Sequence, residues 1–185
     1  MDIWCIIILI EYCLRECDFM ITIRKATPKD ALGISIVNVY TWKPTYSGLI
    51  PEEFIDSRIE KVIEIAERNK REIEENKNFI VATVDDIIVG FASYGESREE
   101  QFINAGEIYA IYVLSGFQGK DIGKKIFTSC IDELKKNRFD SVILNCLKGN
   151  KSLEFYKHMG AKIIGEREDK VKGILMMADI LLLEI

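Results

Sequence analysis

The chain has 185 residues, of which 48% are hydrophobic and 30% are charged, a balance that predicts one globular domain with a substantial core. Its formal net charge is −5, so no basic footprint argues for nucleic acid or an anionic membrane surface as a partner. The five cysteines and single histidine form no CxxC or Cys/His metal spacing, which predicts a reduced, cytoplasmic protein without a metal site.

The first 19 residues differ in pattern from the rest of the chain. They begin with an apolar run from Ile3 to Ile10, which is too short for a bilayer span of about 20 residues. The basic region and cleavage site of a secretory signal are also missing. We expect residues 1–19 to be an extension, either a start-site artefact or an added element that covers apolar surface or a partner. The domain itself is expected to span residues 20–185.

Residues 21–25 alternate apolar and polar side chains, as an edge strand does. Thr27 and Pro28 then predict a helix start, because threonine is a good N-cap and proline suits the first helical position. This helix is expected to run to about Tyr40.

The next segment, residues 41–51, is expected to form a loop, because Pro44 and Gly48 interrupt a helical pattern there. Residues 51–77 follow as one long, strongly charged helix. Its apolar side chains recur on one stripe, which predicts a packed face opposite a solvated one.

Residues 79–84 and 87–94 predict a hairpin whose two-residue turn is Asp85-Asp86. Further strands are expected over residues 107–113, 141–147, 161–166 and 174–185, and further helices over 122–137 and between Asn150 and Gly160. Together, the hairpin and the alternation of strands with helices predict a mixed α/β sheet with helices on both faces.

A strand, a glycine-containing loop and a helix start follow one another between Gly106 and Lys125. Free N–H groups at a helix start lie at the positive end of its dipole and favour a phosphate group. Glycine lets such a group approach the main chain closely. The residue types of this stretch therefore predict an anion site.

Two motifs in this half of the chain resemble the GCN5-related N-acetyltransferases (GNAT), which transfer an acyl group from acetyl-coenzyme A to an amine. Residues 118–123, Gln-Gly-Lys-Asp-Ile-Gly, occupy the place of the family's pyrophosphate signature, and residues 150–161, NKSLEFYKHMGA, resemble its second conserved stretch. The resemblance covers residues 20–185. It implies the GNAT fold, an α/β architecture with a mixed central sheet of about seven strands flanked by helices.

The resemblance also implies which residues hold acetyl-coenzyme A. The expected contacts are Val113, Leu114, Gln118, Gly119, Lys120, Asp121, Ile122, Gly123, Lys124 and Asn150. In the family, a bulge at the end of the signature strand frees the amides of Val113 and Leu114. Asp121 departs from the pattern because glycine is usual there, and its carboxylate would lie near the pyrophosphate.

The family's catalytic positions match Glu107, as the base that deprotonates the amine, and Tyr156, as the acid that protonates the departing thiolate. Each has a structural alternative: a solvent-facing or ion-paired glutamate, and a packed tyrosine. Trp42, Tyr46 and Tyr109 are expected at the acceptor site, although these aromatic side chains could equally cap the core.

These features predict acetyl transfer from acetyl-coenzyme A to a primary amine by direct attack. The acidic balance and the aromatic loop favour a small cationic amine, with a protein N-terminus or lysine as the next choice. The alternative class is a silent acyl-coenzyme A binding module, which Asp121 supports. A homodimer is also plausible for this fold.

Overall fold

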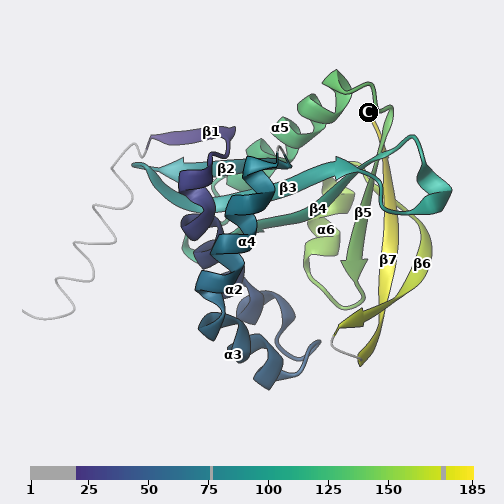
Figure 1. Ribbon diagram of the computed structural model, residues 1–185. Coiled ribbons are helices and arrows are strands. Elements are labelled where there is room, and N and C mark those ends of the chain that lie inside the picture. The colour runs from purple at the N-terminus through teal and green to yellow at the C-terminus, as the bar shows by residue number, and fades with distance from the viewer. Residues whose placement is uncertain (1–19, 76, 172–173) are drawn as a thin grey trace, which may run out of the picture.

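A computed structural model of the chain describes residues 20–75, 77–171 and 174–185 (Figure 1). The predicted extension at residues 1–19 lies outside the described residues. The strands are β1 (Ile21–Lys25), β2 (Asn78–Val84), β3 (Ile87–Glu96), β4 (Gly106–Val113), β5 (Ser141–Leu147), β6 (Lys162–Val171) and β7 (Ile174–Glu184). The α-helices are α2 (Ala31–Tyr46), α3 (Glu52–Glu60), α4 (Val62–Glu74), α5 (Ile122–Lys136) and α6 (Ser152–His158), and short 3-10 turns lie at Pro28–Asp30, Glu100–Phe102 and Ser115–Phe117.

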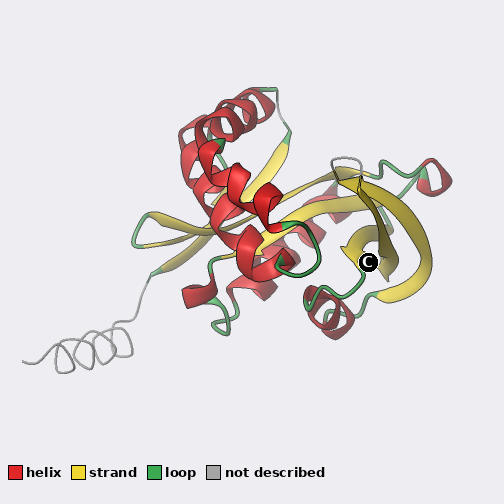
Figure 2. Cartoon of the chain, turned by 90° about the horizontal axis from the view of Figure 1, so that it is seen from below, coloured by secondary structure: helices red, strands yellow, loops and turns green. Residues whose placement is uncertain are grey.

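The strands form one seven-stranded sheet in the order β1-β2-β3-β4-β5-β7-β6. Figure 2 shows that this sheet is twisted. Neighbours are antiparallel except for β4 and β5, which are parallel. This confirms the predicted mixed sheet.

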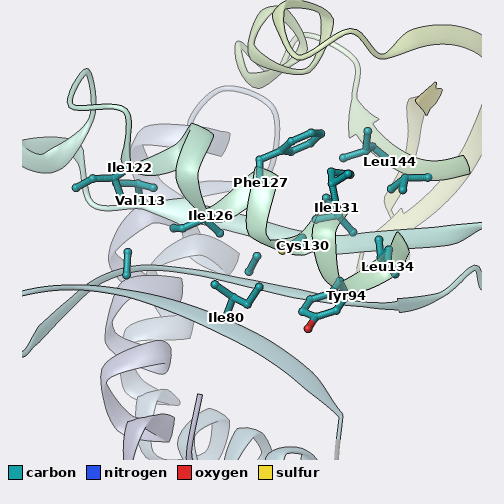
Figure 3. Packing of buried hydrophobic residues seen from close by; sticks show 14 of the residues in the cluster. Ile80, Tyr94, Val113, Ile122, Ile126, Phe127, Cys130, Ile131, Leu134 and Leu144 are labelled. Carbon is teal, nitrogen blue, oxygen red and sulfur yellow. The ribbon is translucent and has the colours of Figure 1, made fainter. Parts of the chain in front are cut away.

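Helices cover both faces of the sheet, with α2, α3 and α4 on one side and α5 and α6 on the other (Figure 1). The alternation along β2 divides its side chains between these faces: Ile80 and Ala82 belong to the α5 cluster, whereas Phe79 and Val81 pack with the α2 cluster. Most of the buried side chains of α5 point at the strands in Figure 3, whereas the Phe127 ring packs against Phe155 of α6. They are Ile122, Ile126, Phe127, Cys130, Ile131 and Leu134, all buried.

The β2–β3 hairpin confirms the predicted turn at Asp85-Asp86. Both aspartates have positive φ, 48° and 65°, as a two-residue hairpin turn requires. Aspartate tolerates the left-handed region better than most residues, which explains why this turn contains no glycine.

Two predictions about the helices were wrong. Helix α2 continues to Tyr46 and contains Pro44, where a loop was expected. Proline removes one hydrogen bond near the helix end, but Ser47 N–H still bonds Lys43 O at 3.0 Å. The extra turn also packs Trp42 edge-to-face against Tyr46, with their ring centroids 4.9 Å apart.

The long helix expected over residues 51–77 is interrupted at Lys61, so that α3 and α4 are separate helices. No glycine or proline marks the break. Each helix packs against α2 independently, so tertiary packing decides a boundary that the local sequence does not signal.

Candidate active site

An opening between β4 and β5 defines the site. These strands pair only at Gly106 with Val142 and at Glu107 with Ile143, and no pairing follows along either strand. A bulge at Tyr109 shifts β4 relative to β3, because Ser93 pairs with Ala110 and Tyr94 pairs with Ile108. The bulge lies within the strand, whereas the sequence placed it at the end.

A cavity of about 480 Å³ lies beside the start of α5. The first bond of this helix runs from Lys125 N–H to Asp121 O at 2.9 Å, so the preceding N–H groups have no acceptor within the helix. The cavity contains many of the predicted coenzyme A contacts: Val113, Gln118, Gly119, Asp121, Ile122, Gly123 and Lys124. Lys120 and Leu114 do not line it.

The loop before α5 is shaped by two left-handed residues. Gly119 has φ +73° and Asp121 has φ +58°. Gln118 ties the loop to β4, because its Nε2 donates to Val113 O at 2.9 Å. The left-handed backbone gives a physical reason why glycine suits position 121, and Asp121 adopts it at a cost of about 1 kcal/mol.

The amides that face the opening differ from those expected. Leu114 N–H donates to Val89 O at 2.9 Å, so it is not free for a ligand, which corrects the prediction. Hydrogen-bonded and non-bonded pairs alternate in an antiparallel ladder, so the N–H groups of Ile111 and Val113 point away from β3. They face the side on which β5 has separated, and Ile111 is a site residue that the sequence analysis missed.

Tyr156 lies where two cavities meet. It lines the cavity at α5 and also a smaller one of about 210 Å³ on the α2 side of the opening. Burial raises the pKa of its hydroxyl, with a smaller contribution from Cys146. The phenol therefore stays protonated at neutral pH and can act as a hydrogen-bond donor.

Asn150 shapes the entry to α6, because its Oδ1 accepts a hydrogen bond from Ser152 N–H at 2.9 Å. It lines the smaller cavity and not the larger one. Asn150 was expected to contact acetyl-coenzyme A, whereas this geometry favours a role in shaping the loop before α6.

The smaller cavity brings together Trp42, Tyr46 and Tyr109, the three side chains expected at the acceptor site. The hydroxyl oxygens of Tyr46 and Tyr112 are 2.8 Å apart, and burial raises the pKa of both phenols. Cys146 also lines this cavity, where burial raises the pKa of its thiol to about 11 and keeps it in the unreactive neutral form.

Glu107 does not fit the role of a directly acting base. Its side chain is only 1% exposed and does not line the smaller cavity. Arg98 engages both carboxylate oxygens, with its main-chain N–H 2.9 Å from Oε2 and its Nε 3.2 Å from each oxygen. Asn145 Nδ2 approaches Oε1 at 3.4 Å. Glu107 is therefore an ion-paired glutamate, which is the structural alternative to a catalytic base.

Several side chains of the smaller cavity were absent from the sequence-based set, among them Arg98, Tyr112, Asn145 and Asp169. Tyr112 lies three residues after Tyr109, so regular alternation would place the two on opposite faces of β4, and the bulge at Tyr109 brings both to this cavity. The others come from a loop, from β5 and from β6, and only the sheet order brings them together.

Within the described ranges, no group of histidine, cysteine, aspartate or glutamate side chains could hold a metal ion. Among the helices that the structure describes, none is long and apolar enough to cross a membrane.

The chain is similar in sequence to known acetyltransferases. A family described as the acetyltransferase (GNAT) domain matches residues 42–178. YuaI of Bacillus subtilis (strain 168), which carries the name uncharacterized N-acetyltransferase, is 30% identical over 156 residues, covering 84% of this chain and 88% of that protein.

Solved structures share the fold. PaiA N-acetyltransferase from Thermoplasma acidophilum, in complex with coenzyme A, gives a TM-score of 0.71 at 24% identity, over 89% of this chain and 99% of that one. A ribosomal-protein-alanine N-acetyltransferase from Brucella melitensis gives 0.64 at 19% identity, with 89% and 99% covered.

Proposed function

Since the chain belongs to the GNAT acetyltransferase family, we propose that it transfers the acetyl group of acetyl-coenzyme A to a small cationic primary amine by direct attack. The observation that carries this proposal is the position of Tyr156, which lines both cavities where β4 and β5 separate. A donor in one cavity and an acceptor in the other would meet at this side chain.

The larger cavity suits the donor. The N–H groups of Ile122, Gly123 and Lys124 at the start of α5 offer hydrogen bonds and a favourable dipole to a pyrophosphate. The amides of Ile111 and Val113, which face the opening, can donate to the pantetheine arm and to the thioester oxygen. Acetyl-coenzyme A supplies the activated acetyl group.

The smaller cavity suits the acceptor. Its volume of about 210 Å³ admits a small molecule or the end of a longer one. Trp42, Tyr46 and Tyr109 give it aromatic walls that can pack against the apolar chain of a small amine, while Arg58 and Arg98 lie over the Trp42 and Tyr109 rings.

In the reaction, the neutral amine forms a bond to the thioester carbon while the carbon–sulfur bond breaks. Tyr156 donates a hydrogen bond to the departing sulfur, and its raised pKa keeps the donor proton in place. The proton that the nitrogen loses as the amide forms passes through water to that sulfur, so coenzyme A leaves as the free thiol. Because Glu107 is tied to Arg98, we propose that the ammonium proton leaves to water in the smaller cavity, before attack.

The test is thiol release from acetyl-coenzyme A by the full chain, measured against a panel of primary amines, amino acids and a peptide N-terminus. The proposal predicts faster release with small cationic amines and an N-acetylated product by mass spectrometry. Peptide as the preferred acceptor would instead favour a protein N-acetyltransferase, and binding without release would favour the silent module.

A further inference from the structure

Helix α2 presents an apolar face to solvent. Leu32, Ile36 and Tyr40 recur four residues apart on it, with exposed fractions of 47%, 40% and 59%. We call these three side chains the α2 stripe. Before Lys43, every residue that the structure shows as exposed on α2 belongs to it. The opposite face packs on the sheet through Val37, which is fully buried. Both faces of this helix are therefore apolar, a pattern typical of a helix that is covered all round.

Helix α5, on the other side of the sheet, shows how this protein builds a face that meets water. Its exposed side chains are all polar or charged: Lys124, Lys125, Thr128, Asp132, Lys135 and Lys136. The α2 stripe differs from this face in every position. Because contiguous exposed apolar side chains mark interaction sites in soluble proteins, we looked for a segment that fits this stripe.

The described chain begins close to the start of α2. A Cβ added to Gly33 would lie 2.7 Å from Ile88 Cδ1, so the first turn of α2 rests directly on the start of β3. Ile88 pairs with Thr83, and Thr83 pairs with Thr22 of β1. Two strand spacings, about 10 Å in all, therefore separate this contact from the strand that follows Met20.

The sequence before Met20 contains an apolar run of suitable length and position. The nine residues 11–19 connect Met20 to the run Ile3–Ile10, which has no charged side chain. Fully extended, nine residues reach about 30 Å, whereas the α2 stripe is only about 12 Å long. The run can therefore reach the whole stripe, and burying its side chains there would be favourable.

We propose that the apolar run at residues 3–10 packs on the α2 stripe of the same chain. A second copy of the chain is the competing occupant, but three side chains expose far less than the roughly 800 Å² per partner of a stable dimer. The contact covers the outer face of the helix that carries Trp42 and Tyr46 to the smaller cavity. The proposal goes beyond acetyl transfer and does not depend on the acceptor.

The experiment uses Trp4, inside the run, as a probe of contact in the full chain. Trp42→Phe makes Trp4 the single tryptophan. In this background we expect Trp4 to be shielded from acrylamide quenching and to emit at short wavelength. Adding Ile36→Glu keeps a good helix former but places a charge under the run, so the bound-to-free ratio should fall at least about 100-fold. Emission should then move to longer wavelength and quenching should increase.

Ile163→Glu is the matched control. Ile163 is 45% exposed, close to the 40% of Ile36, but lies on β6 at the opposite edge of the sheet. This variant should leave the emission and quenching of Trp4 unchanged. Equal quenching in Ile36→Glu and Ile163→Glu would overturn the proposal. Shielding of Trp4 that increases with protein concentration would also overturn it, because the stripe would then belong to contacts between copies.

A second measurement does not need the Trp42→Phe background. Cys5 also lies in the run, so its rate of alkylation by iodoacetamide, followed by peptide mass spectrometry, reports whether the run is covered. Faster alkylation of Cys5 in Ile36→Glu than in the parent and Ile163→Glu would support the proposal. The same rate in all three proteins would overturn it. Circular dichroism of each variant confirms that the domain is folded during the measurement.

Discussion

Arg98 holds Glu107 through both its main chain and its side chain. The main-chain N–H is 2.9 Å from Oε2, and Nε is 3.2 Å from each carboxylate oxygen. The guanidinium side chain is 63% exposed, whereas the carboxylate is 1% exposed. A buried carboxylate therefore anchors a charged side chain in the wall of the acceptor cavity.

Glu107→Gln is expected to damage this anchor more than the chemistry. The amide turns N–H donors toward the donors of Arg98, so we expect unfolding to become easier by about 1–3 kcal/mol and KM for the acceptor to rise. The kcat at saturating amine should stay within about tenfold of the parent. Thermal unfolding and steady-state kinetics measure these effects. A fall in kcat of about 10²-fold with unchanged stability would instead identify Glu107 as the base.

Tyr156→Phe should lower kcat by about 10²-fold, because the departing sulfur loses its hydrogen-bond donor. Affinity for acetyl-coenzyme A should barely change, since the ring still lines both cavities. Tyr40→Phe serves as the control, as this tyrosine is exposed on α2 and lines neither cavity. Equal kcat in the two variants would remove Tyr156 from the mechanism.

Asp121 provides a test of donor binding. Asp121→Asn keeps a side chain that tolerates φ +58° but removes the negative charge beside the helix start. We expect acetyl-coenzyme A to bind about fivefold more tightly to this variant, because the substitution removes a like-charge repulsion of about 1 kcal/mol, the value for two unit charges about 4 Å apart in water. Calorimetric titration measures the change.

Asp121→Gly should match the asparagine variant if charge alone limits affinity. Tighter binding of acetyl-coenzyme A in the glycine variant alone would show that the left-handed backbone, and not the charge, limits affinity. Unchanged affinity in both variants would show that the carboxylate is turned away from the pyrophosphate.

Asp30 makes a pH-dependent contribution to stability. The Arg24 guanidinium donates to both of its oxygens, at 2.7 and 2.8 Å, and lowers the carboxyl pKa from 3.8 to about 2. The lowered pKa means that the stabilisation is complete above the ordinary value and is lost as pH falls through about 2 to 4. Because Arg24 is partly exposed, we expect this ion pair to contribute about 1–2 kcal/mol to the free energy of unfolding at neutral pH.

Denaturant unfolding of the parent and of Asp30→Asn, at pH 7 and near pH 3, tests this contribution of Asp30 to stability. Asp30→Asn should be less stable than the parent at pH 7, and the difference should shrink at the lower pH. A difference that does not depend on pH would show that the lost contribution comes from packing or neutral hydrogen bonds.

The features that could be predicted from the sequence are those that depend on residues close together in the chain. The Asp85-Asp86 turn and the inward stripe of α5 depend on residues close in sequence, and both were found. The continuation of α2 through Pro44 could not be found in this way, because packing of Trp42 on Tyr46 and Phe54 outweighs a local breaker.

The donor cavity was better predicted than the acceptor cavity for the same reason. Gln118 to Lys124 are contiguous and form a local anion site, whereas Arg98, Asn145 and Asp169 come from segments that meet only in the folded sheet. The pairing of Glu107 with Arg98 also depends on how the loop after β3 folds back, which no periodicity in the sequence indicates.

Acetyl transfer by this chain is tested most directly by a single-turnover assay, with the full chain in excess over acetyl-coenzyme A and 1,5-diaminopentane at high concentration. We expect one N-acetylated amine for each acetyl-coenzyme A consumed, detected by mass spectrometry, and a much slower reaction in Tyr156→Phe. Acetyl-coenzyme A that binds but stays intact, with this diamine and with every amine of the panel, would contradict it.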